Sequence, residues 1–223
     1  MSMHRIALTF VTAALPALAT ADDTPAAAAS EDAEAAAEPT GPVNYTVDTA
    51  NSVLIVRTFK GGLGGALAHD HAIRSMKTTG SVTWQPGGEG CNFDITVDVP
   101  SFRLDDIADR KLLGLPGEVD ADQKADITKN MMAEDQLNVA VHKKMTFKAT
   151  RCTDTTVAGM LTIVGKSSPK KVPLTITVDG DTVRAKGQLD FKHSDFGITP
   201  YSLAGFVKNK DELVMTIDLK ASK

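Results

Sequence analysis

The sequence predicts an all-β fold, a single antiparallel barrel or sandwich interrupted by one short helical insertion. Apolar and polar residues alternate with a period of two over most of the chain after residue 42. Roughly ten such segments follow one another, separated by residues that favour turns. The pattern changes to a helical period only once, midway along the chain. A parallel α/β arrangement would need helices between most strands, so this class is excluded.

The clearest strand covers residues 91–99. Cys91, Phe93, Ile95 and Val97 share one face, and polar residues occupy the other. Such alternation is typical of a barrel wall with one dry and one wet face. The other segments with strand character are 43–47, 52–59, 67–73, 78–84, 139–152, 157–165, 171–179, 183–193 and 213–221.

The insertion is expected to contain two short helices, at 105–113 and 120–137. Gly114 suits the end of the first helix, and Asp120 with Gln123 has the spacing of an N-terminal cap. Ile127 and Met131 are four residues apart and would face the interior from one side of the second helix.

The N-terminus has the pattern of an export signal. A short polar start precedes the apolar run 6–19, and Ala19-Thr20-Ala21 matches a small-x-small cleavage site. We therefore expect a signal peptide at 1–21, a disordered Ala/Glu/Pro-rich linker at 22–41 and the barrel domain at 42–223. The apolar run is too short to span a bilayer, so we predict a periplasmic protein with no transmembrane segment after signal removal.

The composition excludes several functions. A net charge of −4 over 223 residues does not suggest a nucleic-acid partner. The sequence has no nucleophilic serine elbow, and its two cysteines are more easily explained structurally than as nucleophiles. In an oxidising compartment Cys91 and Cys152 form a disulfide or remain two small buried thiols. Cys152 is out of phase with Met145 and Phe147, so a bridge requires an irregular strand.

Two histidines stand one residue apart in the strand expected at 67–73. His69 and His71 follow the phase of Leu67 and Ile73, so all four are predicted to point inward. His193 ends another strand in the inward phase. These three imidazoles are candidate ligands of a transition metal, or hydrogen-bonding groups for the head of a bound molecule.

Small residues in the inward phase favour a barrel with interior space, at Gly80, Gly159, Ala185 and Gly187. Arg57, Arg74 and Tyr201 could join the histidines at a rim. The candidate cavity residues are Leu67, Ile73, Val82, Trp84, Phe93, Ile95, Val97, Phe191 and Phe196.

Several segments resemble the YceI-like family of periplasmic polyisoprenoid-binding proteins. They include Tyr45-Thr46-Val47-Asp48, Met145-Thr146-Phe147, the segment 159–165 with Lys171-Val172-Pro173-Leu174, and His193-Ser194-Asp195-Phe196-Gly197-Ile198. The chain departs from the usual family strand at His69-Asp70-His71. The resemblance implies a lipocalin-like antiparallel β-barrel that holds a long isoprenoid chain, as in quinones or polyprenyl phosphates, and it implies binding instead of catalysis.

The sequence therefore predicts a periplasmic, non-enzymatic carrier of a hydrophobic isoprenoid lipid. The alternative is a metal-binding protein or metalloenzyme built on His69, His71 and His193. No cofactor is certain from the residues, and a bound isoprenoid or a transition metal are the two groups that fit. The expected partner is a hydrophobic small molecule or lipid.

Overall fold

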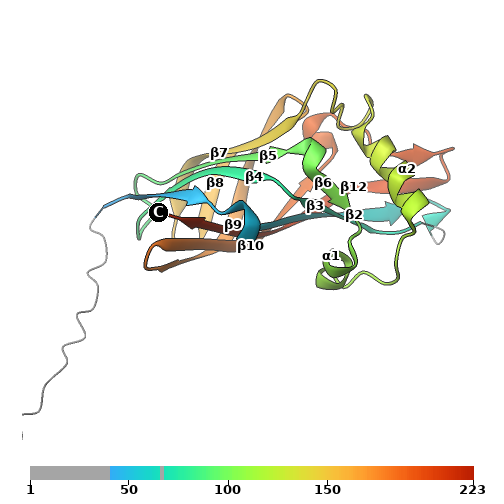
Figure 1. The fold of residues 1–223 in the computed structure, drawn as a ribbon. Coiled ribbons are helices and arrows are strands. Elements are labelled where there is room, and N and C mark those ends of the chain that lie inside the picture. Colours follow the sequence, from blue (N-terminus) through green and yellow to red (C-terminus); the bar gives the residue numbers. More distant parts are fainter. Residues whose placement is uncertain (1–40, 66–67) are drawn as a thin grey trace, which may run out of the picture. The chain divides into compact units, whose positions relative to one another are not determined.

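A closed barrel of eight antiparallel strands forms the centre of the protein. We describe it from a computed structural model, which defines residues 41–65 and 68–223. The barrel runs in the order β1-β4-β5-β7-β8-β9-β10-β12 and closes where β12 pairs with β1 (Figure 1). These strands are β1 Val43–Val47, β4 Thr78–Trp84, β5 Asn92–Asp98, β7 Lys144–Thr153, β8 Thr156–Ile163, β9 Lys166–Asp179, β10 Thr182–Lys192 and β12 Val207–Ser222. The predicted fold class is confirmed.

Along one of its edges, the long strand β12 pairs with two different strands, one after the other. Its C-terminal residues pair with β1, and its earlier residues pair with β2, Val53–Gly61. From β2 the sheet continues to β3, His71–Ser75, and β6, Phe102–Leu104. A short hairpin strand, β11 Ser202–Leu203, pairs with the start of β12. The sheet thus extends beyond the closed part of the barrel, toward the two helices.

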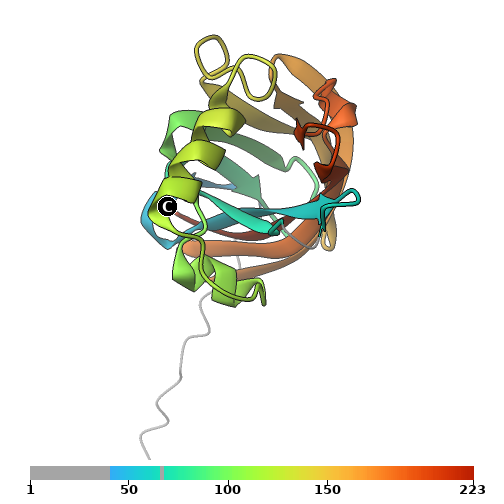
Figure 2. The ribbon, with the colours of Figure 1, turned by 90° about the vertical axis from the view of Figure 1, so that its right-hand side faces the viewer.

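The helical insertion is present but its helices are shorter than expected. They are α1, Ile107–Leu112, and α2, Ala121–Met132. The Asp120 carboxylate accepts a hydrogen bond from the backbone N–H of Gln123, as the capping pattern predicted. Figure 2 looks onto the barrel end that α2 borders and shows this helix crossing one side of the opening.

The segment after α1 covers the outer face of β2 and β3. Ile55 and Ala72 are fully buried on that face and pack with Leu115 and Leu113. Hydrophobic residues of these two strands are therefore buried on both faces, which explains why 52–59 is more uniformly apolar than the other strands.

Four strand boundaries differ from the sequence prediction by more than two residues, and one of them is the start of β9, at Lys166 instead of 171. Residues 139–143 form a turn and a short loop before β7, and the histidine strand begins only at His71. Strand β12 starts at Val207 and is longer than the predicted 213–221, because an irregularity between Asn209 and Leu213 breaks the alternation that marks a strand in sequence. The short strands β6 and β11 were not predicted.

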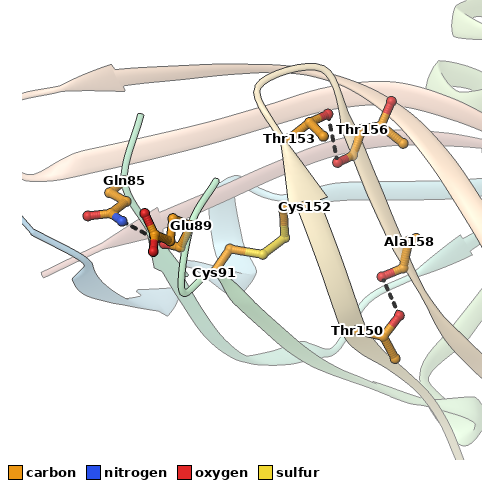
Figure 3. Close-up of a disulfide and its surroundings, with 8 residues drawn as sticks. All are labelled: Gln85, Glu89, Cys91, Thr150, Cys152, Thr153, Thr156 and Ala158. Atoms are coloured by element: carbon orange, nitrogen blue, oxygen red, sulfur yellow. Dashed lines mark hydrogen bonds between the residues drawn. A yellow bond between two sulfur atoms is a disulfide. The ribbon is translucent and has the colours of Figure 1, made fainter. Parts of the chain in front are cut away.

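A disulfide joins Cys91 to Cys152, with their Cα atoms 6.1 Å apart (Figure 3). The phase conflict noted above is removed by a β-bulge. Ala149 pairs with Gly159, whereas Arg151 pairs with Ala158, so Thr150 is one extra residue in β7. This residue shifts the following side chains to the opposite face, and Cys152 becomes buried.

No helix among the described residues is long and apolar enough to cross a membrane. The predicted signal peptide and all but the last residue of the predicted linker lie outside the described residues, so both remain predictions.

Candidate ligand-binding cavity

The barrel interior contains two adjoining cavities. We call them the outer cavity, of about 420 Å³, and the inner cavity, of about 110 Å³. Apart from Ser75 and Thr146, the residues that line the inner cavity are apolar. The outer cavity reaches α2 and the β11–β12 hairpin. Both cavities are bordered by the same six residues, which mark their junction: Val56, Ile73, Phe102, Met145, Ile163 and Met215.

Most of the predicted cavity residues do line this interior. Ile73 borders both cavities; Phe93, Ile95 and Val97 line the inner one. The outer cavity is lined by His69, His71, Phe191, His193, Phe196 and Tyr201. The barrel is therefore suited to a hydrophobic ligand. Leu67 lies outside the described residues.

The prediction that Val82 and Trp84 line the cavity is wrong. Both are buried in the packed core, where the Trp84 ring meets the Phe93 ring edge-on at 6.4 Å between centroids. Of the small inward residues, Ala185 lines the inner cavity, but the three glycines do not create space. A Cβ on Gly187 would lie 2.1 Å from the Pro173 carbonyl oxygen, so this glycine permits close contact between strands.

The buried carboxylate of Asp105 contacts the His71 ring and fixes its orientation. Nδ1 of His71 lies 2.6 Å from Oδ2 of Asp105, which is fully buried. Burial alone would raise the pKa of Asp105, but hydrogen bonds from His71 and the Ala72 N–H, together with nearby positive charge, hold that pKa below its usual value. An ionised carboxylate only accepts, so Nδ1 carries the proton and Nε2 is left for a ligand.

Asp105 also neutralises a buried arginine. Nη1 of Arg110 donates to Asp105 at 2.8 Å, and Arg110 is only 3% exposed. The same guanidinium donates to the carbonyl oxygens of Asp70, Pro116 and Gly117, which fixes the loop after α1 against β3. Sequence reasoning missed this network, because carboxylates in and beside a short helix are usually solvated. The spacing of Asp105 and Arg110 in the sequence does not indicate that the two side chains are buried together, so no sequence pattern could have identified the network.

Thr58 provides a second polar group in the cavity wall. It pairs directly with His71 across β2 and β3, and both line the outer cavity. Its Oγ1 is buried and has no hydrogen-bond partner within the described part of the chain. Because buried polar atoms in native proteins are nearly always paired, this hydroxyl indicates where a polar atom of a ligand would bind.

His193 lies across the same cavity and is anchored in a similar way. Its Nδ1 is 3.1 Å from the Asp211 carbonyl oxygen, which can only accept, so Nδ1 is the donor. Burial lowers the pKa of His193, so its neutral form predominates near pH 7. Its Nε2 is then a hydrogen-bond acceptor. Its predicted inward position is confirmed, although it follows β10 instead of belonging to it.

His69 behaves differently from the prediction. It precedes β3, is exposed, and borders the outer cavity with its ring 6.5 Å from that of His71. A regular strand would have placed both imidazoles equally inside. Among the described residues, no group of three or more His, Cys, Asp or Glu side chains is arranged to hold a metal ion. The geometry therefore gives no support to the metal site on His69, His71 and His193.

The two rim arginines face away from the cavities. Arg57 pairs with Asp70 at 2.6 Å, and Arg74 pairs with Asp109 at 2.7 Å. They occupy the outer phase of β2 and β3; Arg74 helps attach the insertion to the barrel, whereas Arg57 ties β2 to the segment before β3. Tyr201, in contrast, lines the outer cavity, and its hydroxyl oxygen accepts a hydrogen bond from Asn130 of α2.

Helix α2 forms part of the cavity wall. None of its residues is fully buried, yet Gln123, Asp126, Ile127, Asn130 and Met131 border the outer cavity. The inward positions predicted for Ile127 and Met131 are confirmed, and the exposed Asp126 stands at the opening. A helix with an apolar side but little burial covers an opening and does not contribute a packed core.

Comparisons with known proteins agree with this architecture. The model of the YceI-like domain matches residues 45–221. The crystal structure of Burkholderia cenocepacia BcnA is similar with a TM-score of 0.56 and 21% identity, over 79% of this chain and 99% of that chain. A mutant Campylobacter jejuni YCEI protein, solved with a monobromobimane guest, has a TM-score of 0.50 and 16% identity, over 68% and 84% of the respective chains. At these identities the two structures support the fold. No curated protein matches the chain.

Proposed function

Since the chain belongs to the YceI-like domain family, we propose that it binds and carries an isoprenoid lipid with an oxygen-bearing head group in the periplasm. The tail would occupy the inner cavity and the head would lie in the outer cavity beside His71 and Thr58. This role is binding and not catalysis. The outer cavity falls within the size range of small-molecule sites.

The observation that carries the proposal is the change of chemistry along one continuous interior. The inner cavity is almost entirely apolar, whereas the outer cavity has an unpaired buried hydroxyl at Thr58 and two imidazoles anchored through Nδ1. A purely aliphatic ligand would leave the Thr58 hydroxyl without a partner. A lipid with an apolar tail and a carbonyl or hydroxyl head matches both the apolar inner cavity and the polar groups of the outer cavity.

The lining favours a neutral head over a phosphate. The residues around the outer cavity include Asp126 but no Lys or Arg within the described chain. Phosphate sites usually contain a guanidinium or an ammonium group. A quinone therefore fits better than a polyprenyl phosphate, since its oxygens can accept from Thr58, and the hydroxyls of the quinol can donate to Nε2 of His71 or His193.

Native mass spectrometry of the protein purified from the periplasm of its producing cells tests the proposal, with extraction and identification of bound lipids. We expect a stoichiometric isoprenoid adduct, and a higher affinity for an isoprenoid quinone than for a polyprenyl phosphate of equal tail length. Protein that carries no organic adduct and binds neither added lipid would refute lipid carriage. A preference for the phosphate would refute the neutral head.

Filling the junction between the cavities should select against long tails. Met215→Trp adds volume where the two cavities meet, and each methylene excluded from the barrel forfeits about 0.8 kcal/mol of transfer free energy. We expect the affinity for a long-tailed quinone to fall by at least about tenfold, while a short-tailed quinone still binds. Met215→Leu is the matched control and should keep both affinities. Fluorescence titration measures them, and an equal loss for both tails would contradict the assignment of the tail to the inner cavity.

Replacing Thr58 by Val should affect stability and binding in opposite directions. Removing an unpaired buried hydroxyl is expected to raise the free energy of unfolding of the ligand-free protein by about 1 kcal/mol, and to weaken quinone binding about fivefold. Thr78→Val is the matched control, because the Thr78 hydroxyl is hydrogen-bonded to Ser75 and its loss should destabilise the protein. Denaturant titrations with and without quinone check this. Unchanged affinity in Thr58→Val would exclude Thr58 from head-group binding.

A further inference from the structure

The rim of the outer cavity carries large apolar side chains that are turned to solvent. Leu63, in the turn after β2, is 93% exposed; Leu203 and Phe206, at the tip of the β11–β12 hairpin, are 59% and 50% exposed. The two segments lie against each other, since the Gly64 N–H donates to the Phe206 carbonyl oxygen at 2.9 Å. Figure 1 shows both at the same end of the barrel as α2. We call the segments 60–65 and 201–210 the apolar rim.

Three lysines flank these apolar residues, and acids adjoin the two segments at Asp211, which follows Lys210, and at Asp70, whose carboxylate accepts a hydrogen bond from the Lys60 N–H. The apolar rim contains Lys60, Lys208 and Lys210 and no Asp or Glu, although the whole chain is acidic. All three lysines are exposed, and no ion pair within the described residues uses their ammonium groups. Lys208 and Lys210 lie beside the glycine turn, against Gly61 and Gly62. The positive charge is therefore located where the apolar side chains project.

The apolar rim is continuous with the cavity. Leu203 and Val207 line the outer cavity, and Leu203 also belongs to the exposed hairpin tip. An apolar path thus leads from the surface into the barrel. Solvent-exposed apolar side chains next to basic residues are the composition by which proteins bind the interface of anionic membranes.

We propose that the apolar rim docks onto an anionic lipid bilayer, with Leu63, Leu203 and Phe206 inserted at the interface and the three lysines near lipid phosphates. Docking in this orientation places the cavity opening against the membrane, so that a hydrophobic ligand passes between bilayer and barrel without crossing water. The proposal concerns the surface and holds whatever molecule occupies the cavities.

Co-sedimentation with vesicles tests the docking. The protein purified from its producing cells, with its N-terminus defined by mass spectrometry, is mixed with vesicles of phosphatidylcholine alone or with phosphatidylglycerol. We expect binding to the anionic vesicles that weakens as salt is added. The double variant Leu63→Ser with Phe206→Ser should bind at least about tenfold more weakly, since each side chain contributes of the order of a full apolar burial. Ile107→Ser with Leu112→Ser, which removes two exposed apolar side chains of α1, is the matched control and should bind like the wild type.

The lysines are tested in the same way. Lys60→Gln, Lys208→Gln and Lys210→Gln together should reduce binding roughly fivefold per charge, whereas replacing Lys148, Lys171 and Lys186 on the barrel wall should have less effect. Circular dichroism confirms that each variant is folded. Equal binding by wild type and rim variants, or no binding to anionic vesicles, would overturn the proposal. Sedimentation velocity provides a further test. A wild-type dimer that the Leu63 and Phe206 substitutions convert to a monomer would also overturn the proposal, because the apolar rim would then be a contact between two copies.

Discussion

Asp105→Asn is expected to lower the free energy of unfolding by about 3–5 kcal/mol, the usual effect of removing one partner of a buried ion pair. Asn keeps the size of the side chain and tolerates the positive φ of 54° at this position, so the change removes mainly the charge. Arg110 would remain buried without its counter-charge, and His71 would lose the acceptor that orients it. The loop between α1 and α2 should loosen first, since Arg110 anchors it.

Chemical denaturation followed by fluorescence measures this change. Asp106→Asn is the matched control. The Asp106 carboxylate is exposed and its ion pair with Arg103 is long, at 3.7 Å, so the substitution should change the free energy of unfolding by less than about 1 kcal/mol. A drop of less than about 1 kcal/mol in Asp105→Asn would show that the buried network contributes little. Nitrogen-15 spectra of the His71 ring provide a second measurement, since the wild type should carry its proton on Nδ1 and the variant should lose that preference.

The same pair predicts how stability depends on pH. The pKa of Asp105 is lower in the folded protein than in the unfolded chain, so the unfolded state binds the proton first as the pH falls. The contribution of Asp105 is therefore complete above about pH 4 and is lost below it, through the folded-state pKa. Acid titration of the wild type should show a steeper loss of stability below pH 4 than that of Asp105→Asn.

Removing the disulfide is the other change with a large expected effect. Cys91 and Cys152 close a loop with a sequence separation of 61, for which the chain-entropy model gives about 4 kcal/mol. The double variant Cys91→Ser with Cys152→Ser should lose about that much free energy of unfolding. The β-bulge at Thr150 and the packing of β7 against β8 should persist, because they depend on backbone pairing.

Thermal and denaturant unfolding with and without reductant measure the effect. Reductant should shift the wild type toward the double variant and leave the double variant unchanged, which is the internal control. Quinone binding should be retained at temperatures where the variant is folded, because neither cysteine borders a cavity within the described structure. A wild type insensitive to reductant under unfolding conditions would indicate that the cysteines are not bridged in solution.

The strands could largely be predicted from sequence because period two reports directly which face of a strand is buried. That signal placed β1, β4, β5, β8 and β10 within a residue or two of their observed bounds. It failed where the backbone departs from regular pairing. At His69 the chain has not yet entered β3, and between Asn209 and Leu213 an irregularity interrupts β12, so counting every second residue gave the wrong face or the wrong start.

The cavity was predictable in part for the same reason. Inward residues such as Phe93, Ile95 and Phe191 follow from the alternation, and all line the interior. Whether an inward residue meets space or packed neighbours depends on its position along the barrel axis, which the alternation does not report. Trp84 has the same phase as residues that line the cavities and yet is packed against Phe93.

By itself the sequence determined an antiparallel β fold with one helical insertion, the inward face of most strands and the resemblance to the YceI-like family, because these depend on local alternation and short motifs. Only the tertiary structure decided which polar groups meet. Asp105 and Arg110 are five residues apart, but their burial with His71 requires α1 and its following loop to fold over β3. The unpaired Thr58 hydroxyl, the bridged cysteines and the exposed apolar rim likewise depend on contacts between distant segments, and no local pattern encodes them.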